Sequence, residues 1–350
     1  MDTRASLIFD EFGSTGLLTA MEGEDVSLSG IAAFEDCGPG DLVFVDQERA
    51  VETIRARQPS AAVTGPALQE ALSALPGLTL LIAANVKLAH ALIRQRYADR
   101  DVLDSEWPEI HASAVVFEGC EIGAGSRIGP QVVLGKGVRI GRETAIMAGT
   151  VIEHGAVIGD RSAIHPRVTI GYDCEIGNDV IVQSGAVLGA EGYGFAQDEK
   201  GRSHRIPQLG RVVVEDWVSI GAACCIDRGT YGETRIGAGT KLDNLCHIAH
   251  NVEIGKDCLL TAGFVVAGST KIGDRVIASG QTGVLDHLEI CDDVVLVRRA
   301  GVVEDIDQPG MYAGLPAEPL SSYMKSRAVL MRFSDLRKRV RQLEKKLSED

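Results

Sequence analysis

A branched aliphatic residue recurs at every sixth position between residues 110 and 307, and this period sets the expected fold. Glycine often follows it, as in Ile122-Gly123, and the fifth position of the hexad is mostly small or β-branched. Six residues fit neither an α-helix nor the two-residue alternation of an open strand. The period is the signature of a parallel β-helix, in which each hexapeptide supplies one short strand and one corner. We therefore predict a mainly β fold whose aliphatic residues point into the shaft.

The length of the repeat predicts the size of this shaft. Fourteen hexads precede an interruption, three follow it, and twelve more follow a four-residue slip, which makes 29; only the hexad at Ala278 lacks a branched aliphatic at its first position. Three hexads per coil give nearly ten coils, and strands about 4.8 Å apart give a shaft roughly 45 Å long. The interruption at 194–213 is long for a loop inside a strict repeat, so we expect it over a functional face. A tolerated insertion is the alternative.

The segments on either side of the repeat have other patterns. Residues 1–105 alternate short apolar runs (26–32, 41–45, 61–63 and 78–82) with helical patterns (47–57, 65–74 and 85–98), which predicts a small α/β domain of nucleotide-binding type. An acidic linker at 101–108 leads to the β-helix at 106–307. Residues 308–350 form the third part, a C-terminal helical extension.

The C-terminal extension carries an apolar heptad seam and a cluster of basic residues. The seam is spaced four and three residues apart in alternation, which predicts a helix that meets other helices: Val329, Phe333, Leu336, Val340, Leu343 and Leu347. Residues 325–346 contain nine Lys or Arg residues and two acidic residues, so this segment has a net charge of +7, whereas the whole chain has a net charge of −14. This surface either balances the acidic body as a solvated face or docks an acidic macromolecule, and an exposed basic helix could also touch anionic lipid.

Charge and composition narrow the class of protein. A net charge of −14 in 350 residues argues against general nucleic-acid binding. The start of the chain does not resemble a secretory signal, and its apolar runs are too short to cross a bilayer, so we expect a cytoplasmic protein without a transmembrane segment. Five of the eight cysteines stand at the fifth position of a hexad, which predicts core packing and not disulfides or a metal site: Cys120, Cys174, Cys224, Cys246 and Cys258.

The candidate site is a polar cluster inside the repeat. A β-helix has no internal pocket, so ligands must bind outside it, between neighbouring shafts or under loops. Within nine residues the repeat holds five polar side chains: Asp243, Asn244, His247, His250 and Asn251. His250 falls on a turn, and His287 follows two coils and one residue later, which predicts the same edge of the shaft or the opposite side of a subunit interface. Imidazole is the natural general base near neutral pH.

A metal site is the alternative use of these histidines. His247, His250 and His287 could supply three zinc ligands across a trimer interface. However, His247 and His250 occupy different hexad positions, and no pattern of supporting residues is visible around them. We therefore predict no metal ligands.

Five segments resemble one family of hexapeptide-repeat enzymes. They are Ile206-Pro-Gln-Leu-Gly, Ile226-Asp-Arg-Gly, Asp243-Asn-Leu-Cys-His-Ile-Ala-His-Asn-Val, Ala267-Gly-Ser-Thr-Lys-Ile-Gly and Gly283-Val-Leu-Asp-His-Leu-Glu-Ile. They are similar to the UDP-3-O-(3-hydroxyacyl)glucosamine N-acyltransferases, which catalyse the third step of lipid A synthesis in Gram-negative bacteria. The resemblance covers the shaft and its exit at Met311-Tyr-Ala-Gly-Leu-Pro, and the three-part layout agrees.

The resemblance implies a left-handed β-helix, a homotrimer with active sites between subunits, and roles for individual residues. His250 would be the general base that takes a proton as the glucosamine 2-amine attacks a 3-hydroxyacyl-acyl carrier protein thioester. A backbone N–H near Gly268 would stabilise the tetrahedral oxyanion. His287 and His247 would contact substrate, and Asp243 and Asn251 would orient it.

The acyl carrier protein would be co-substrate and partner, and no cofactor is implied. Because carrier proteins are acidic, the resemblance favours the basic tail as a docking surface. Its expected docking residues are Arg327, Arg332, Arg337 and Lys338. The enzyme would work in the cytoplasm, where it could contact the inner membrane peripherally.

The N-terminal part departs from the family pattern. The family holds uracil with a Phe, an Asn three residues on and an aromatic residue three beyond that. Here Phe44 is present, but Gln47 and Ala50 occupy the other two positions. Only Phe44 is therefore carried over as a substrate-binding residue.

Three other functions stay open at this point. A coenzyme A-dependent acyl- or acetyltransferase acting on another sugar would use the same scaffold. A zinc-dependent trimer of the carbonic anhydrase type would use the histidines as ligands. A non-catalytic scaffold would leave the polar cluster at 243–251 unexplained.

Overall fold

The computed structural model describes residues 1–347, which form two compact units that divide after Asp101. No helix within residues 1–347 is long and apolar enough to cross a membrane.

The first unit is a five-stranded sheet with helices on both faces. The strand order is β2-β7-β6-β5-β4, and the bounds are β2 (Leu18–Glu22), β4 (Gly30–Ile31), β5 (Asp41–Val45), β6 (Ala61–Thr64) and β7 (Thr79–Ala83). β4 to β7 are parallel, whereas β2 is antiparallel to β7. The short strands β1 (Thr3–Arg4) and β3 (Ser27–Leu28) form a separate antiparallel pair. The helices are α1 (Ala5–Gly13), α2 (Ala50–Arg57), α3 (Pro66–Ser73) and α4 (Val86–Tyr97).

Two apolar clusters fill the space between these helices and the sheet. Ala5 and Ile8 of α1 pack with Ile93 of α4 on one face. Ile54 of α2 packs with Leu72 of α3 on the other face. Burial on both faces explains why β6 and β7 are apolar except at Thr64 and Thr79, as is typical of parallel strands covered on two sides.

The sequence pattern missed three elements of this unit and displaced others. β1, α1 and β2 were not predicted. α1 has no capping side chain at Arg4 to mark its start. The strand expected at 26–32 is divided into β3 and β4, since β3 pairs with β1 while β4 pairs with β5. The helix expected from residue 47 begins at Ala50.

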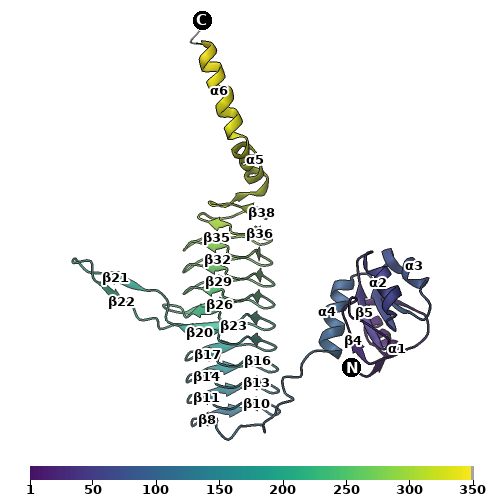
Figure 1. Cartoon of the computed structure of the whole chain (residues 1–350). Helices are drawn as coiled ribbons and strands as arrows, with labels where there is room; N and C mark the ends of the chain where they lie inside the picture. The colour runs from purple at the N-terminus through teal and green to yellow at the C-terminus, as the bar shows by residue number, and fades with distance from the viewer. Residues whose placement is uncertain (348–350) are drawn as a thin grey trace. The chain divides into compact units, whose positions relative to one another are not determined.

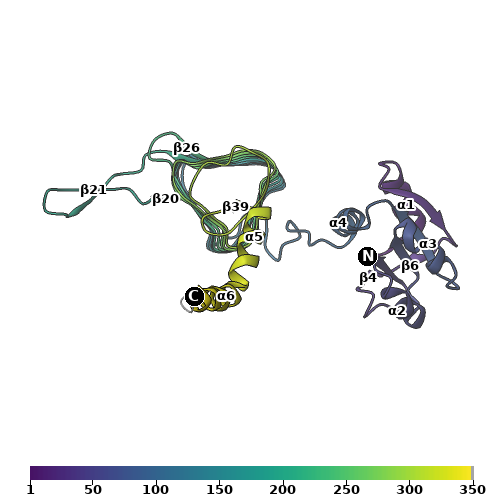
Figure 2. The ribbon, with the colours of Figure 1, turned by 90° about the horizontal axis from the view of Figure 1, so that it is seen from above.

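The second unit is a triangular prism of three parallel sheets, seen from the side in Figure 1 and end-on in Figure 2. Sheet 1 contains β10 (Arg127–Ile128), β13 (Ala145–Ile146), β16 (Ala163–Ile164), β19 (Ile181–Val182), β24 (Ser219–Ile220), β27 (Lys241–Leu242), β30 (Leu259–Leu260), β33 (Ile277–Ala278), β36 (Val294–Leu296), β38 (Gly310–Ala313) and β39 (Glu318–Pro319). Sheet 2 contains β8 (Val115–Val116), β11 (Val133–Leu134), β14 (Val151–Ile152), β17 (Thr169–Ile170), β20 (Val187–Ala190), β25 (Cys225–Asp227), β28 (His247–Ile248), β31 (Val265–Val266), β34 (Gly283–Val284) and β37 (Gly301–Val302). Sheet 3 contains β9 (Glu121–Ile122), β12 (Arg139–Ile140), β15 (Val157–Ile158), β18 (Glu175–Ile176), β23 (Arg211–Val214), β26 (Glu233–Ile236), β29 (Glu253–Ile254), β32 (Lys271–Ile272) and β35 (Glu289–Ile290).

The register confirms the hexapeptide β-helix. Arg127 pairs with Ala145 and Ile128 with Ile146, so one coil takes eighteen residues, or three hexads. The second residue of each two-residue strand points inward, and these residues form one continuous core. The first coil is the exception: Ile110 and Val116 are 46% and 40% exposed, because no further coil stacks beneath them.

The core also explains the cysteines. Cys174, Cys224, Cys246 and Cys258 are buried in it, and Cys120 is half-buried near its exposed end. All eight cysteines are free thiols. Their predicted packing role is confirmed.

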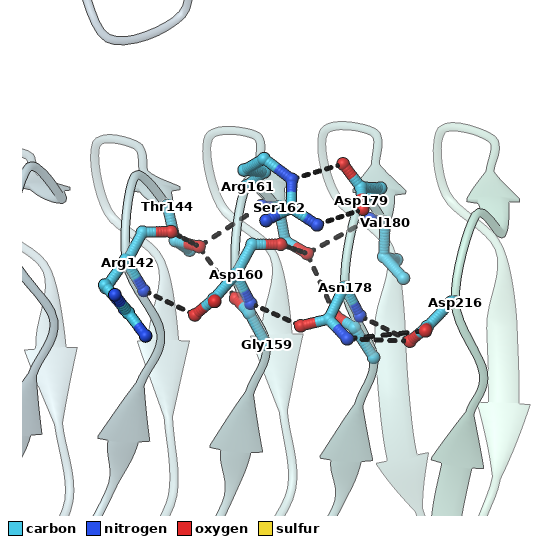
Figure 3. Close-up of polar contacts among 11 residues, drawn as sticks. Arg142, Thr144, Gly159, Asp160, Arg161, Ser162, Asn178, Asp179, Val180 and Asp216 are labelled. Atoms are coloured by element: carbon cyan, nitrogen blue, oxygen red, sulfur yellow. Dashed lines mark hydrogen bonds and ion pairs between the residues drawn. The ribbon is translucent and has the colours of Figure 1, made fainter.

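Side chains at the corners tie successive coils together. In the corner after sheet 3, a carboxylate oxygen of Asp160 accepts the N–H of Arg142, and the side-chain oxygen of Asn178 accepts the N–H of Asp160. Asp216 accepts from Asn178 in the same way (Figure 3). The hydroxyl of Ser162 accepts the N–H of Val180 and donates to a carbonyl of the next coil. Corner peptide groups that the strands leave unpaired are thereby satisfied.

The three outer faces differ in polarity. The residue directly before each inward aliphatic points outward. On sheet 3 these residues are mostly charged: Glu121, Arg139, Val157, Glu175, Val213, Arg235, Glu253, Lys271 and Glu289. On sheets 1 and 2 many are aliphatic and exposed, among them Val151, Ile181, Leu259, Val265 and Ile277.

The interruption of the repeat is a hairpin that projects from the prism in both views (Figures 1 and 2). Its strands are β21 (Phe195–Gln197) and β22 (Ser203–Arg205), which pair antiparallel. Only the two roots of the insertion, where it leaves β20 and enters β23, pack against the prism.

Two helices follow the prism. They are α5 (Leu320–Met331) and α6 (Phe333–Leu347), separated by Arg332, whose φ and ψ are −97° and 5°. The heptad seam is therefore divided between two helices. Its side chains from Val329 to Leu343 are 44–62% exposed in the single chain. The side chains of Lys345, Lys346 and Leu347 lie outside those that the structure describes.

Candidate active site

The polar cluster lies at the corner that follows sheet 2. Successive strands β25, β28, β31 and β34 bring the residues after them into one column. The N–H of Ser269 donates to the carbonyl of His250 at 3.0 Å, and the N–H of His287 donates to the carbonyl of Gly268 at 3.0 Å. His250, Gly268 and His287 therefore share one edge of the prism, which for His250 and His287 is the first of the two placements that their spacing predicted.

Two glycines enclose the His250 ring. A Cβ on Gly268 would lie 2.7 Å from Cε1 and 2.8 Å from Nε2 of His250. A Cβ on Gly192, in the first root of the insertion, would lie 2.9 Å from Cβ of the histidine and 3.0 Å from its Cδ2. Neither position has room for a side chain, so the two glycines set where the imidazole lies.

The partners of Nδ1 set the tautomer of His250. Nδ1 lies 3.3 Å from Oδ1 of Asn251 and 3.5 Å from Oγ1 of Thr230. The Thr230 hydroxyl donates its proton to Oε1 of Gln208 at 2.7 Å, so its oxygen offers Nδ1 a lone pair. Because both neighbours of Nδ1 are acceptors, the proton of the neutral imidazole belongs on Nδ1. Nε2, on the side of Gly268, then carries the free lone pair that a general base needs.

The Asn251 amide is itself held in one orientation. Its Oδ1 accepts the N–H of Thr230 at 2.9 Å, and its Nδ2 donates to the carbonyl of Tyr231 at 2.7 Å. Asn251 therefore contacts His250 and is hydrogen-bonded to Thr230 and Tyr231 within the same chain.

Gly268 is a buried residue, and its peptide N–H makes no hydrogen bond to any residue within 1–347. A free N–H beside a histidine base is the donor that a developing oxyanion requires.

Asp227 is a buried carboxylate of the Ile226-Asp-Arg-Gly segment, for which the sequence predicted no role. It ends β25, and its carboxylate lies 3.8 Å from Nε2 of His247. Burial raises the pKa of the Asp227 carboxyl, while the nearby His247 and His250 act in the opposite direction. The signal in the sequence was the acidic residue at the end of a strand in Ile226-Asp-Arg-Gly.

Two other predicted residues lie differently from His250. Asp243 follows β27 of sheet 1, at another corner of the prism, where its carboxylate accepts the N–H groups of Asn244 and Ala262 at 2.7 and 3.1 Å. One chain does not bring it to His250. His247 points outward from sheet 2 on the strand before His250, and its side chain is 46% exposed.

Phe44 lies in the first unit, in a cavity of about 470 Å³ that is also lined by Phe34, Asp46, His90 and Arg94. Its ring is stacked on the His90 ring, with centroids 4.2 Å apart and 24° between the planes. Burial, with help from Arg94, lowers the pKa of His90.

The two departing residues lie outside this cavity. Gln47 is exposed and accepts from Arg49, while Ala50 is fully buried in the core. His90 on α4 therefore supplies the second ring beside Phe44.

The expected docking residues Arg327, Arg332, Arg337 and Lys338 are all exposed. Arg327 lies on α5, Arg337 and Lys338 lie on α6, and Arg332 lies between the helices. Within residues 1–347 of one chain, no group of three or more His, Cys, Asp or Glu residues is placed to hold a metal ion.

Comparison with known proteins decides the family. The model of the bacterial transferase hexapeptide (six repeats) matches residues 137–172 and 155–190. The UDP-3-O-acylglucosamine N-acyltransferase of Methylococcus capsulatus is 49% identical over 349 residues, which cover 100% of this chain and 99% of that protein. This chain belongs to the UDP-3-O-acylglucosamine N-acyltransferase family. The enzyme of the same name from Coxiella burnetii is 35% identical over 95% of this chain and 96% of its own.

Family membership confirms that the protein is an acyltransferase with a hexapeptide β-helix of the left-handed class. Among solved structures, the UDP-N-acetylglucosamine O-acyltransferase of Moraxella catarrhalis matches with a TM-score of 0.46 and 27% identity, over 60% of this chain and 73% of that one.

Proposed function

We propose that this acyltransferase moves a 3-hydroxyacyl chain from acyl carrier protein to the 2-amine of UDP-3-O-(3-hydroxyacyl)glucosamine, a step of lipid A synthesis. The observation that carries the proposal is the pairing of His250 with Gly268: an imidazole with its lone pair on Nε2 beside an unpaired peptide N–H. Acyl transfer needs a base and an oxyanion donor at one point. The acceptor follows from the full-length likeness to the family.

In the proposed reaction the 2-amine attacks the thioester carbonyl while Nε2 of His250 takes one proton from the nitrogen. The carbonyl oxygen becomes an oxyanion that accepts the N–H of Gly268, an interaction typically worth about 2.7–4 kcal/mol. The intermediate then collapses to the amide, and the imidazolium gives its proton to the departing thiolate. Asp227 stabilises the imidazolium by its charge. No metal or cofactor is needed for these steps.

The polarity of the outer faces supports a homotrimer. Aliphatic side chains on sheets 1 and 2 are exposed in the single chain, whereas sheet 3 carries charges suited to solvent. Contact between sheets 1 and 2 of neighbouring copies buries that apolar surface. In this arrangement the substrate lies in a cleft between copies, where His247 and His287 contact it and Asp243 of a neighbouring copy orients it.

The basic tail supports a carrier-protein donor. Its exposed arginines and lysine stand in a chain with net charge −14, so they concentrate positive charge on one segment. An acidic carrier protein complements that segment, and complementary charge raises association rates. Arg327, Arg332, Arg337 and Lys338 are the docking residues of the proposal.

The first unit is assigned to the nucleotide. In the proposal, uracil stacks on the face of Phe44 that His90 does not cover. We divide the chain into this nucleotide-binding part at 1–105, the β-helix at 106–307 and the C-terminal extension at 308–350, whose helices begin at Leu320 after two further strands of sheet 1.

The cytoplasm is the proposed site of action, where acyl carrier protein is found. Eight free thiols suit a reducing compartment. The exposed basic and apolar tail gives the enzyme a means of touching the inner membrane peripherally.

The test is acyl transfer by the purified protein. The donor is 3-hydroxymyristoyl-acyl carrier protein, the acceptor is UDP-3-O-acyl-glucosamine, and the coenzyme A thioester runs in parallel. Amide product from the carrier-bound donor, with little from coenzyme A, is the expected result. Product only from the coenzyme A thioester favours the second candidate, a coenzyme A-dependent sugar acyltransferase. This candidate stays open because Gln47 and Ala50 stand where the family has two uracil-binding residues. Absence of product from both donors contradicts the proposal.

A further inference from the structure

Arg228 is a large side chain that the proposed reaction does not use, although it is only 1% exposed. It follows Asp227 at the end of β25. Its guanidinium donates to three main-chain carbonyls: Nε to Gly189 at 2.8 Å, Nη1 to Gly210 at 2.9 Å and Nη2 to Tyr172 at 3.1 Å. Among residues 1–347 it forms no ion pair with a carboxylate. Burying a charge without a counter-ion is costly, so a built site must hold it.

The site around Arg228 is shaped for a guanidinium. A Cβ on Gly171 would lie 2.7 Å from Nη2, and one on Gly189 would lie 3.4 Å from it, so two glycines leave the space that the group fills. The central carbon of the guanidinium lies 3.4 Å from the centroid of the Tyr172 ring, a cation–π contact. The Tyr172 ring is also stacked with the ring of His154, whose centroid lies 5.2 Å away and whose plane is nearly parallel to it.

Two of the three carbonyls that Arg228 binds belong to the two roots of the insertion. Gly189 lies in β20, before the hairpin, and Gly210 lies directly before β23, after it. The returning root is also held at Gln208, whose carbonyl accepts from the Tyr172 hydroxyl at 3.3 Å and whose side chain accepts from Thr230. One guanidinium therefore joins the beginning and the end of the insertion to the same coil.

These roots are also what touches His250. Gly192, three residues after Gly189, packs against the histidine, and Gln208 fixes the Thr230 hydroxyl that lies 3.5 Å from Nδ1. Arg228 does not contact His250 itself.

We infer that Arg228 is a positioning residue: by fastening both roots of the insertion it holds Gly192 and Thr230 against His250 and keeps Nε2 beside Gly268. The inference rests on the proposed function, because the effect is on the base of that reaction. In this inference the two roots of the insertion position His250, a role that does not involve its projecting hairpin.

The test compares Arg228→Lys and Arg228→Met with Arg161→Met. Arg161 is a corner arginine that pairs with Asp179 on another edge of the prism, so its loss controls for removing a guanidinium from a corner. Lysine keeps the charge but cannot reach three carbonyls together. Misplacing a catalytic group by about 1 Å costs on the order of 100-fold. We expect kcat to fall about 10- to 100-fold in both Arg228 variants, with KM for each substrate within about twofold and Arg161→Met unchanged.

Two further readouts separate positioning from a general loss of structure. Thr230→Val and Arg228→Lys, measured singly and together, form a double-mutant cycle. If Arg228 acts on His250 through Thr230, the loss of kcat in the double variant should be far smaller than the product of the two single losses. The acidic limb of the pH–kcat profile should also move in the Arg228 variants, because the contacts of His250 change. Two results would contradict the inference: Arg228 variants whose kcat per folded enzyme equals that of the wild type, or a double variant whose loss equals the product of the two single losses. If Arg228→Met does not fold, Arg228→Lys and the double-mutant cycle still provide the test. Absence of amide product from the unmodified enzyme contradicts the proposed function instead.

Discussion

Replacement of Gly268 by alanine is the sharpest perturbation of the site, because it adds one methyl group and keeps the peptide N–H. The new Cβ would lie 2.7 Å from Cε1 of His250, which is 0.7 Å inside the 3.4 Å at which ordinary contact begins. The imidazole must move by about that amount or more. Misplacement of a catalytic group by roughly 1 Å costs on the order of 100-fold in rate, or about 2.7 kcal/mol of transition-state stabilisation.

The assay is kcat for amide formation with the carrier-bound donor, measured together with the thermal midpoint. Gly280→Ala is the matched control, since Gly280 holds the same position in its hexad after β33 and its added Cβ would lie no closer than 3.4 Å to another residue. We expect Gly268→Ala to lose about 100-fold in kcat with a thermal midpoint near that of Gly280→Ala. Wild-type turnover in folded Gly268→Ala would refute the reasoning that this glycine sets the position of the base.

Three other changes test separate parts of the account. Burial raises the pKa of Asp227, so the folded state binds its proton more tightly than the unfolded chain, and stability falls as pH rises above the ordinary aspartate pKa of about 3.9. The thermal midpoint of Asp227→Asn should therefore rise relative to that of the wild type as pH rises above about 4. A difference in midpoint that stays constant with pH would contradict this. Phe44→Ala should raise KM for the UDP-sugar about tenfold or more while leaving KM for the carrier-bound donor unchanged, since stacking on an aromatic ring is worth about 1–3 kcal/mol per base; equal KM values for the sugar in steady-state kinetics would exclude Phe44 from the nucleotide site. Phe264 is fully buried at a hexad position that usually holds a small residue, so Phe264→Ala should lower the free energy of unfolding by about 3–5 kcal/mol in denaturant titration, and a loss below about 1 kcal/mol would show that the core collapses into the space.

The repeat could be predicted from sequence because each hexad repeats the same local constraint. An inward aliphatic such as Ile128 pairs with Ile146, eighteen residues later, so the six-residue period also predicts the register between coils. The same regularity placed His250, Gly268 and His287 on one edge. The first unit offered no such repetition, and α1, which lacks a capping side chain, was missed.

The parts of the site that escaped prediction depend on the insertion. Gly192 and Gln208 leave the six-residue period, so no count along the sequence places them near His250. Arg228 reads as an ordinary charged corner residue until the structure brings Gly189 and Gly210 to it. His90 and Phe44 lie on different elements, α4 and β5, and only the packing of the sheet stacks their rings. Conversely, Asp243 is near His250 in sequence but lies at another corner, because one strand of the coil separates them.

The central claim is that Nε2 of His250 removes the proton from the attacking amine. The direct measurement is single-turnover amide formation by His250→Ala and the wild-type enzyme across pH, with folding checked by thermal denaturation. General acid–base catalysis contributes about 10²- to 10⁴-fold, so the account predicts a folded variant slowed by at least about 100-fold whose rate has lost the wild-type acidic limb. A folded variant with near-wild-type turnover and an unchanged pH profile would contradict it.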